Sequence, residues 1–223
     1  TSAKDWLTVN QQLELFNGGF RIGTDENKAY LSFGLYQEFD FFGYVPHDIA
    51  VLAINGNKEY LGKRFNLGDI NAKAEVLSVF HVGYHKKIQD DLIFGLRAKI
   101  YSSIFNASSI NNSGYIYTAP STDAFYTQTI YSDLQLNTSG VGAFTSGNYN
   151  GNAATDIKKG ILLGGNLGLG VDLGITYYPQ PNLQITASLL DLGFVNHTKN
   201  VESYTYKGIY NYKGLVPNFN NEN

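Results

Sequence analysis

The sequence predicts an all-β fold, specifically an antiparallel up-and-down transmembrane β-barrel with long extracellular loops. Several segments alternate between apolar side chains on one face and small or polar side chains on the other. Charged residues make up only 16% of the chain, whereas an average soluble domain carries roughly 25%. No run of about 18 apolar residues occurs, so any membrane crossing must be made by strands.

The first two predicted strands, Leu13–Ile22 and Lys28–Phe42, place their charges on one face. In the first, we expect a glycine-bearing bulge at Asn17–Gly19 that shifts the frame, so that Glu14 before it and Arg21 after it both point inward. In the second, an apolar face with Leu35 and Phe39 opposes Glu38 and Asp40. The charged face is the candidate barrel interior.

The next two predicted strands are Ala72–His85 and Leu92–Ile104, joined by a short turn at 86–91. Their inward faces carry Glu75, His81 and His85 on the first strand, and Arg97 and Lys99 on the second. Hairpin pairing across the turn predicts that His81 lies near Arg97, and that Glu75 lies within diagonal reach of the two basic residues.

The segment Leu167–Phe194 shows the alternation most clearly, as two strands joined by the short turn Pro179–Asn182. One face of the first strand is apolar from Leu167 to Tyr177, whereas the other carries glycine, threonine and the single carboxylate of Asp172. A sheet face exposed to water usually carries Lys and Glu, so this composition favours a barrel lumen over a soluble sheet.

The last predicted strand carries an aromatic ladder opposite Ser203, Thr205 and Lys207. The ladder consists of Tyr204, Tyr206, Tyr210 and Tyr212. Two interpretations stay open. The rings form an interfacial girdle at headgroup level, or they pack across strands as aromatic pairs.

The connections fall into two length classes, as expected for a barrel with short periplasmic turns and long extracellular loops. The two long ones are 44–68 and 108–165. In the first, His47–Ile54 is predicted to form a few helical turns that fold into or over the barrel mouth. The second is an extracellular lobe in which Phe125–Leu136 forms a hairpin outside the membrane, because we expect no membrane crossing between Ile104 and Leu167.

We assign residues 1–223 to a single β-barrel domain. Single-chain bacterial barrels have an even number of strands and begin and end in the periplasm, whereas our count is about seven strands. The same parity places Thr1 outside. We therefore expect a large fragment of a longer barrel that lacks strands at one or both ends.

The candidate functional residues are the inward-facing charged residues and one histidine, which together carry both signs of charge. They are Glu14, Arg21, Glu38, Asp40, Glu75, His81, Arg97, Lys99, Asp172 and Lys207. Two interpretations stay open. The residues pair as ion-pair ladders that fill the interior, because an unpaired buried charge costs several kcal/mol. Alternatively, some of them line a solute path, with loop 44–68 as its plug.

No motif for catalysis, metal binding or cofactor binding is found. His81 and His85 are about 13 Å apart along a strand at roughly 3.3 Å per residue, too far to hold one ion. No nucleophile motif accompanies His47-Asp48, and no Lys-Ser/Thr follows the glycines at 164–168. A net charge of −3 provides no basic surface for nucleic acid. We expect no enzyme, no cofactor and no nucleic-acid partner.

Several motifs occur in order along the chain. They are FNGGFR (Phe16–Arg21), Pro46-His47-Asp48 followed by Asn55-Gly56-Asn57, LIFGLRAK (Leu92–Lys99) and the aliphatic-Asp-Leu-Gly-Phe element that ends at Phe194. With these motifs the sequence resembles, over nearly its whole length, an uncharacterised family of Bacteroidota outer-membrane barrels. In architecture that family is related to the FadL-type transporters of hydrophobic compounds and to PorV of type IX secretion. The resemblance implies a longer barrel in outer-membrane lipid of a bacterial cell, and it implies no substrate.

Three functional alternatives remain. A FadL-like channel or transporter for small compounds, hydrophobic ones included, would show a continuous cavity or a lateral gap between strands. A PorV-like binding or assembly component with protein partners at its extracellular loops would show a filled lumen and an ordered, Tyr-rich lobe. A soluble β-sandwich adhesin would pack Leu167–Tyr177 against a second sheet. Transport is favoured by analogy of architecture alone.

Overall fold

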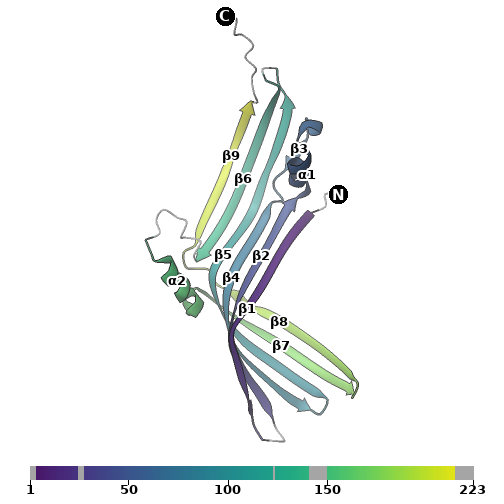
Figure 1. Cartoon of the computed structure of the whole chain (residues 1–223), viewed down its shortest axis with the longest axis vertical. Helices are drawn as coiled ribbons and strands as arrows, with labels where there is room; N and C mark the ends of the chain where they lie inside the picture. The colour runs from purple at the N-terminus through teal and green to yellow at the C-terminus, as the bar shows by residue number, and fades with distance from the viewer. Residues whose placement is uncertain (1–3, 25–27, 123, 141–149, 214–223) are drawn as a thin grey trace, which may run out of the picture.

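The fold was obtained as a computed structural model that describes residues 4–24, 28–122, 124–140 and 150–213. These residues form one nine-stranded sheet in which all pairings are antiparallel. The all-β prediction is confirmed. The described strands form an open, curved sheet and do not close into a barrel (Figure 1).

The described residues form nine strands and four helical segments. The strands are β1 (Lys4–Ile22), β2 (Ala29–Pro46), β3 (Arg64–Asn66), β4 (Asn71–Gln89), β5 (Leu92–Pro120), β6 (Tyr126–Gly140), β7 (Asn166–Gln180), β8 (Leu183–Val195) and β9 (Glu202–Lys213). The helical segments are α1 (His47–Asn55), η1 (Lys58–Tyr60), α2 (Ala153–Lys159) and the kinked turn η3 (Gly160–Gly164). Helix α1 confirms the helical turns predicted after Pro46. None of the helices in the described part is long and apolar enough to span a membrane.

Strand β5 is shared by two divergent parts of the sheet. Along one edge it pairs with β4 and, near its end, with β3. Along the other edge, Leu92–Ser103 pairs with β7 and Phe105–Pro120 pairs with β6, so Ile104 is left between the two ladders. Strand β8 extends the sheet beside β7, and β9 extends it beside β6 (Figure 1). We call this branch point the fork, and the parts that contain β7 and β6 the lower and upper halves.

Two predicted segments differ from the structure in length or position. The strand predicted to end at Ile104 continues to Pro120, and β6 pairs with this continuation as the predicted hairpin. The extracellular position of that hairpin stays a prediction. The predicted bulge at Asn17–Gly19 is wrong, because the register shifts at Leu15 instead. The two glycines keep regular register, and a Cβ at Gly19 would clash with the Tyr30 hydroxyl. These glycines therefore allow the neighbouring strand to approach closely. Arg21 still lies on the same face as Glu14, as predicted.

The register divides the sheet into two faces of opposite character. The polar face contains the row Glu14, Tyr36, Val79 and Tyr101. The apolar face contains the row Phe16, Leu35, Phe80, Ile100 and Leu169. A buried cluster of Tyr36, Val79 and Tyr101 lies on the polar face, with Leu77 and Val195 packed against it. The polar face is therefore the side on which the core lies.

Candidate functional site

The ladder registers place all ten predicted site residues on the polar face of the sheet. On the polar face of the lower half, His81 lies opposite Lys99, and Arg97 lies opposite Asp172. In the upper half, Lys207 lies opposite Asp133. The structure nevertheless distributes these residues over several groups, and it does not gather them in one cluster. Their role in a solute path stays a prediction.

The central group is an ion cluster around Lys99, which we call the lysine cluster. The Lys99 ammonium lies 2.9 Å from Asp172 Oδ2 and 2.5 Å from Asp191 Oδ1. Tyr101 donates its hydroxyl hydrogen to Asp191 Oδ1 at 3.0 Å, and the Asp191 backbone N–H donates to Asp172 Oδ1 at 2.8 Å. Lys99 is 4% exposed and Asp172 is 6% exposed. This geometry supports the ion-pair interpretation for these two residues.

A β-bulge in β8 brings Asp191 into the lysine cluster. The register shifts between the pairs Val171–Leu192 and Leu173–Leu189, so β8 has one extra residue here. Asp191 has a φ of 56°, a left-handed conformation that Asp tolerates better than most residues. The bulge turns its carboxylate towards Lys99. Sequence alternation missed Asp191, although the adjacent pair Leu189-Leu190, which breaks the alternation, was an available signal.

Two glycines make room for the tyrosine of this cluster. A Cβ at Gly170 would clash with the Tyr101 hydroxyl, and one at Gly193 would lie 3.0 Å from its ring. Large side chains on a sheet commonly pack over glycines on neighbouring strands. The Leu-Asp-Leu-Gly-Phe element of the sequence thus has a local explanation, because its Asp forms the bulge and its Gly accommodates Tyr101.

Arg97 lies between two hollows on the polar face. Its Nη1 atom is 3.7 Å from Asp172 Oδ2, and its side chain is about half exposed. One hollow, of about 200 Å³, has Gly83, Gly95 and Gly174 in its wall together with Arg97 and Asp172. The other, of about 260 Å³, is lined by Glu14, Tyr30, Tyr36, His81 and Arg97. Ser32 lines both hollows. A small polar group could contact Arg97 from either side.

His81 lies beside Arg97 in the second hollow, so the predicted proximity of these two residues is confirmed. Its direct cross-strand partner is Lys99, and Arg97 is a diagonal neighbour. The His81 ring nitrogen Nδ1 is buried and has no hydrogen-bond partner in the described structure. A buried nitrogen without a partner is uncommon and costly.

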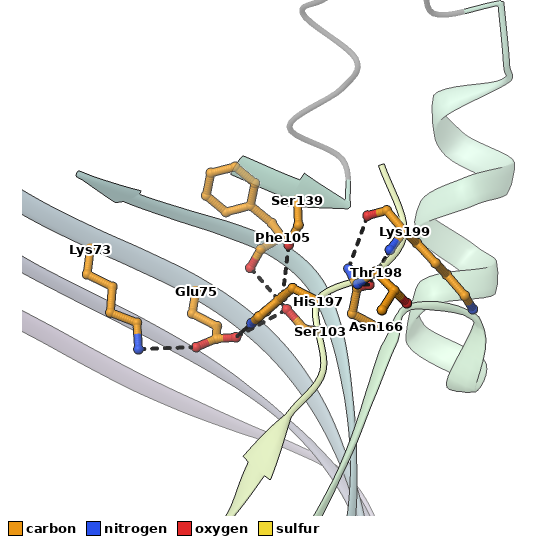
Figure 2. A network of polar contacts seen from close by, with 9 residues as sticks. All are labelled: Lys73, Glu75, Ser103, Phe105, Ser139, Asn166, His197, Thr198 and Lys199. Carbon is orange, nitrogen blue, oxygen red and sulfur yellow. Dashed lines mark hydrogen bonds and ion pairs between the residues drawn. The ribbon is translucent and has the colours of Figure 1, made fainter. Parts of the chain in front are cut away.

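Glu75 belongs to a separate network at the fork (Figure 2). It lies 3.5 Å from His197 Nε2 and 3.7 Å from the Lys73 ammonium, and it accepts a hydrogen bond from the Ser103 hydroxyl. His197 in turn contacts the Ser139 hydroxyl at 2.9 Å. The predicted contact of Glu75 with the basic pair is wrong. Glu75 pairs with Asn106, beyond the extra residue Ile104, and therefore lies on the far side of the fork from Lys99.

Asn166, at the start of β7, holds the segment that connects β8 to β9 through hydrogen bonds (Figure 2). Its side chain is buried, and its Oδ1 atom accepts hydrogen bonds from the backbone N–H groups of Thr198 and Lys199, both at 2.7 Å. Its Nδ2 atom donates to the Lys199 carbonyl at 3.3 Å. Neither Asn166 nor His197 could be predicted from the sequence, because each acts through a pairing that only the fork creates.

The remaining predicted residues lie towards the two ends of the polar face. Arg21 lines a third hollow with Tyr30 and His85 at the lower end. Asp40 accepts a hydrogen bond from Asn10, with Glu38 next along the same face. In the upper half, the Lys207 ammonium lies 2.5 Å from Asp133 Oδ2, and this carboxylate raises the pKa of Lys207. Within the described residues, no group of three or more His, Cys, Asp or Glu could hold a metal ion.

The fold and the site define a class of protein: an all-β protein with one open antiparallel sheet, whose polar face buries Lys99 and Asp172 and whose opposite face exposes large apolar side chains such as Leu169 and Ile175. The chain belongs to DUF5723, a family of unknown function whose model matches residues 1–223. A search of curated proteins and a search of solved structures each found no match.

Proposed function

We propose that the chain forms the wall of a bacterial outer-membrane β-barrel, with the polar face towards the lumen and the apolar face towards lipid. The observation that carries this proposal is the reversed burial of the two faces. Lys99 and Asp172 are almost fully buried, whereas Leu169 is 58% exposed and Ile175 is 44% exposed. A sheet in water buries its apolar face, and a membrane barrel exposes that face to lipid.

The apolar face has the height that one membrane crossing requires. On β5 the outward residues Leu92, Phe94, Leu96, Ala98 and Ile100 are apolar up to Ser102, which lies in one row with Gln37 and Ser78. Below Leu92, the turn carries Asp90 and Asp91. A transmembrane β-strand needs about 9–11 residues. The segment Leu92–Ser102 therefore matches one crossing, and the upper half projects beyond the membrane.

For the activity of the barrel we propose non-enzymatic passage of small compounds, hydrophobic ones included, as in a FadL-like channel. Two observations support it. The hollows beside Arg97 lie on the face assigned to the lumen. The fork interrupts the hydrogen-bonded wall next to β5, because β6 and β7 both leave Ile104 without a partner. A lateral opening at this interruption would distinguish a transporter from a filled barrel. The resemblance noted in the sequence supports a Bacteroidota outer membrane as its location.

A PorV-like binding or assembly component is the second candidate, and the upper half supports it. Strands β6 and β9 form an ordered extension of the sheet beside upper β5, with Tyr204, Tyr206, Tyr210 and Tyr212 on one face of β9. Such an aromatic surface suits a protein partner. The soluble β-sandwich adhesin has less support, because the described residues form a single sheet and no second sheet covers Leu167–Tyr177.

Membrane fractionation of the full-length protein, followed by gel electrophoresis with and without boiling, tests the barrel. We expect a band that requires detergent for extraction and that changes mobility on boiling. A protein that stays soluble without detergent would contradict the proposal and favour the adhesin.

Solute uptake by liposomes that contain the heat-modifiable protein separates the two membrane candidates. Transport predicts uptake that depends on the protein and that changes in Arg97→Ala, with Lys158→Ala, on the exposed helix α2 and outside the hollows, as the control. Uptake equal to that of empty liposomes would refute transport and favour an assembly component.

A further inference from the structure

A cavity lies at the fork, between the sheet and the helical segments α2 and η3. Strand β6 ends at Gly140 and β7 begins at Asn166, so β5 has no neighbour on that edge at Ile104. A cavity of about 180 Å³ occupies this position, lined by Ile104, Gly140, Gly165, Asn166, Lys159 and Lys199 among others. The share of liquid volume of one water is about 30 Å³, so the cavity accommodates a considerably larger group.

The charges around the cavity favour an anion. Lys159 of α2 and Lys199 of the β8–β9 link both line it, together with one carboxylate, that of Asp156. The Lys159 ammonium is 3.8 Å from Asp156 Oδ1, which is a long ion pair, and the Lys159 side chain is largely exposed. The Lys199 ammonium donates to the Gly164 carbonyl at 2.8 Å. Lysine binds phosphate as a point charge with three donors.

Contacts with Ser102 fix the height of the cavity on the sheet. The Ser102 hydroxyl donates to the Gly160 carbonyl at 2.6 Å and accepts from the Gly165 N–H at 3.0 Å. Ser102 lies in one row with Gln37 and Ser78, next to the apolar stretch Leu92–Ile100 of β5. If this face meets lipid, as proposed above, the cavity lies where hydrocarbon gives way to headgroups.

We propose that the fork cavity binds a phosphate group, namely the headgroup of an anionic amphiphile in the leaflet beside it. The position of the cavity at the membrane surface rests on the proposed function, whereas its affinity for phosphate rests on the cavity and its lysines. Basic pockets at the membrane surface bind anionic headgroups in this way. Free phosphate shares the chemistry, but it lacks the acyl chains that would pack on the apolar face below Ser102.

Binding measurements on the full-length protein in dodecyl maltoside micelles test the proposal. One series adds dioleoyl phosphatidic acid to the micelles, a second adds dioleoyl phosphatidylcholine, and a third adds sodium phosphate to plain micelles. We expect saturable binding of phosphatidic acid, weaker binding of inorganic phosphate, and less binding of the zwitterionic lipid. Lys159→Gln should weaken phosphatidic acid binding about fivefold, the factor expected for one lysine at a membrane surface.

The matched control is Lys158→Gln, which removes the same charge from the next residue of α2, outside the cavity lining. Equal weakening by the two variants would overturn the proposal, since it would indicate diffuse attraction. Equal binding of the two lipids would overturn it as well. Binding of inorganic phosphate as tight as that of phosphatidic acid would overturn the lipid assignment. A heat-modifiable, detergent-requiring protein that fails these tests refutes the cavity alone, whereas a soluble protein refutes the barrel.

Discussion

The buried ammonium of Lys99 is the residue-scale feature that most constrains the polar face. Removing a charge from water is costly, and two carboxylates with a bridging backbone N–H offset this cost here. The arrangement needs Lys99 on β5, Asp172 on β7 and the bulged Asp191 on β8. The lysine cluster therefore fixes three strands of the lower half relative to one another.

Removal of the Lys99 ammonium should destabilise the fold strongly. Lys99→Ala leaves two carboxylates close together without their cation, and breaking a buried pair in this way costs about 3–5 kcal/mol. The measurement is the urea unfolding midpoint in detergent. Lys87→Ala is the control, because its ion pair with Asp90 is exposed, and it should leave the midpoint unchanged. Equal midpoints for the two variants would show that the cluster contributes nothing.

The sequence predicted the facing of single residues better than their partners. Alternation places Lys99 and Asp172 on one face, and the structure agrees. Alternation could not predict that Asp191 joins Lys99, because the β-bulge that turns this residue interrupts the two-residue period of the strand. It also misassigned the partner of Glu75, because the hairpin register puts Glu75 opposite Asn106, seven residues along β5 from Lys99 and out of diagonal reach.

At the scale of elements, strand β7 shows the two faces in their simplest form. Its apolar residues point to one side and Gly168, Gly170, Asp172 and Gly174 to the other. This alternation was predicted from sequence. The side chains of β7 on the polar side are small because its glycines leave room for side chains of neighbouring strands. Which side chains fill this room depends on which strands are neighbours.

Arginine should be tolerated on one face of β7 and not on the other. Leu173→Arg places a charge on the proposed lipid face and should cost about 2–4 kcal/mol near the midplane. Gly174→Arg is the neighbouring control, because no atom lies within 4 Å of a Cβ built there. Unfolding midpoints in lipid vesicles report the difference. Equal tolerance at the two positions would contradict the assigned facing.

Helix α1 is joined to β3 through the carboxylate of Asp48. Asp48 Oδ2 accepts the Asn66 backbone N–H at 2.9 Å, and Oδ1 lies 3.2 Å from the Lys63 ammonium. The hydrogen bond from Asn66, followed by the contact with Lys63, holds the pKa of Asp48 below its ordinary value. These contacts require the ionised carboxylate.

Acid should therefore loosen this segment. Because the folded pKa of Asp48 is lowered, its stabilisation is fully present above the unfolded pKa of about 3.9, and it is lost as pH falls through the folded value. Hydrogen–deuterium exchange of residues 47–66, compared at each pH with Asp48→Asn, measures it. We expect slower exchange in the native protein at pH 6 and no difference well below pH 3.9. A difference that persists in strong acid would contradict this role.

At the scale of the whole molecule, the class of fold was predictable and the topology was not. Alternation, scarce charge and the absence of long apolar runs predict an all-β chain. The fork was not predicted, because Leu92–Ile104 has the length of a complete strand. Its alternation gives no sign that the strand continues to Pro120. Residue patterns specify which face a strand buries, whereas the choice between β6 and β7 as neighbour depends on contacts far apart in sequence.

The central claim is that the apolar face meets lipid while the polar face lines a lumen. The sequence has no cysteine, so single cysteines can carry nitroxide labels without background. Labels at Phe33, Val82 and Leu173 probe the apolar face in lipid vesicles, and labels at Ser32, Gly174 and Ser188 probe the polar face. We predict that the first set collides mainly with dissolved oxygen and the second set does not. Equal oxygen access for the two sets, or access of the first set to a water-soluble nickel chelate, would contradict the account.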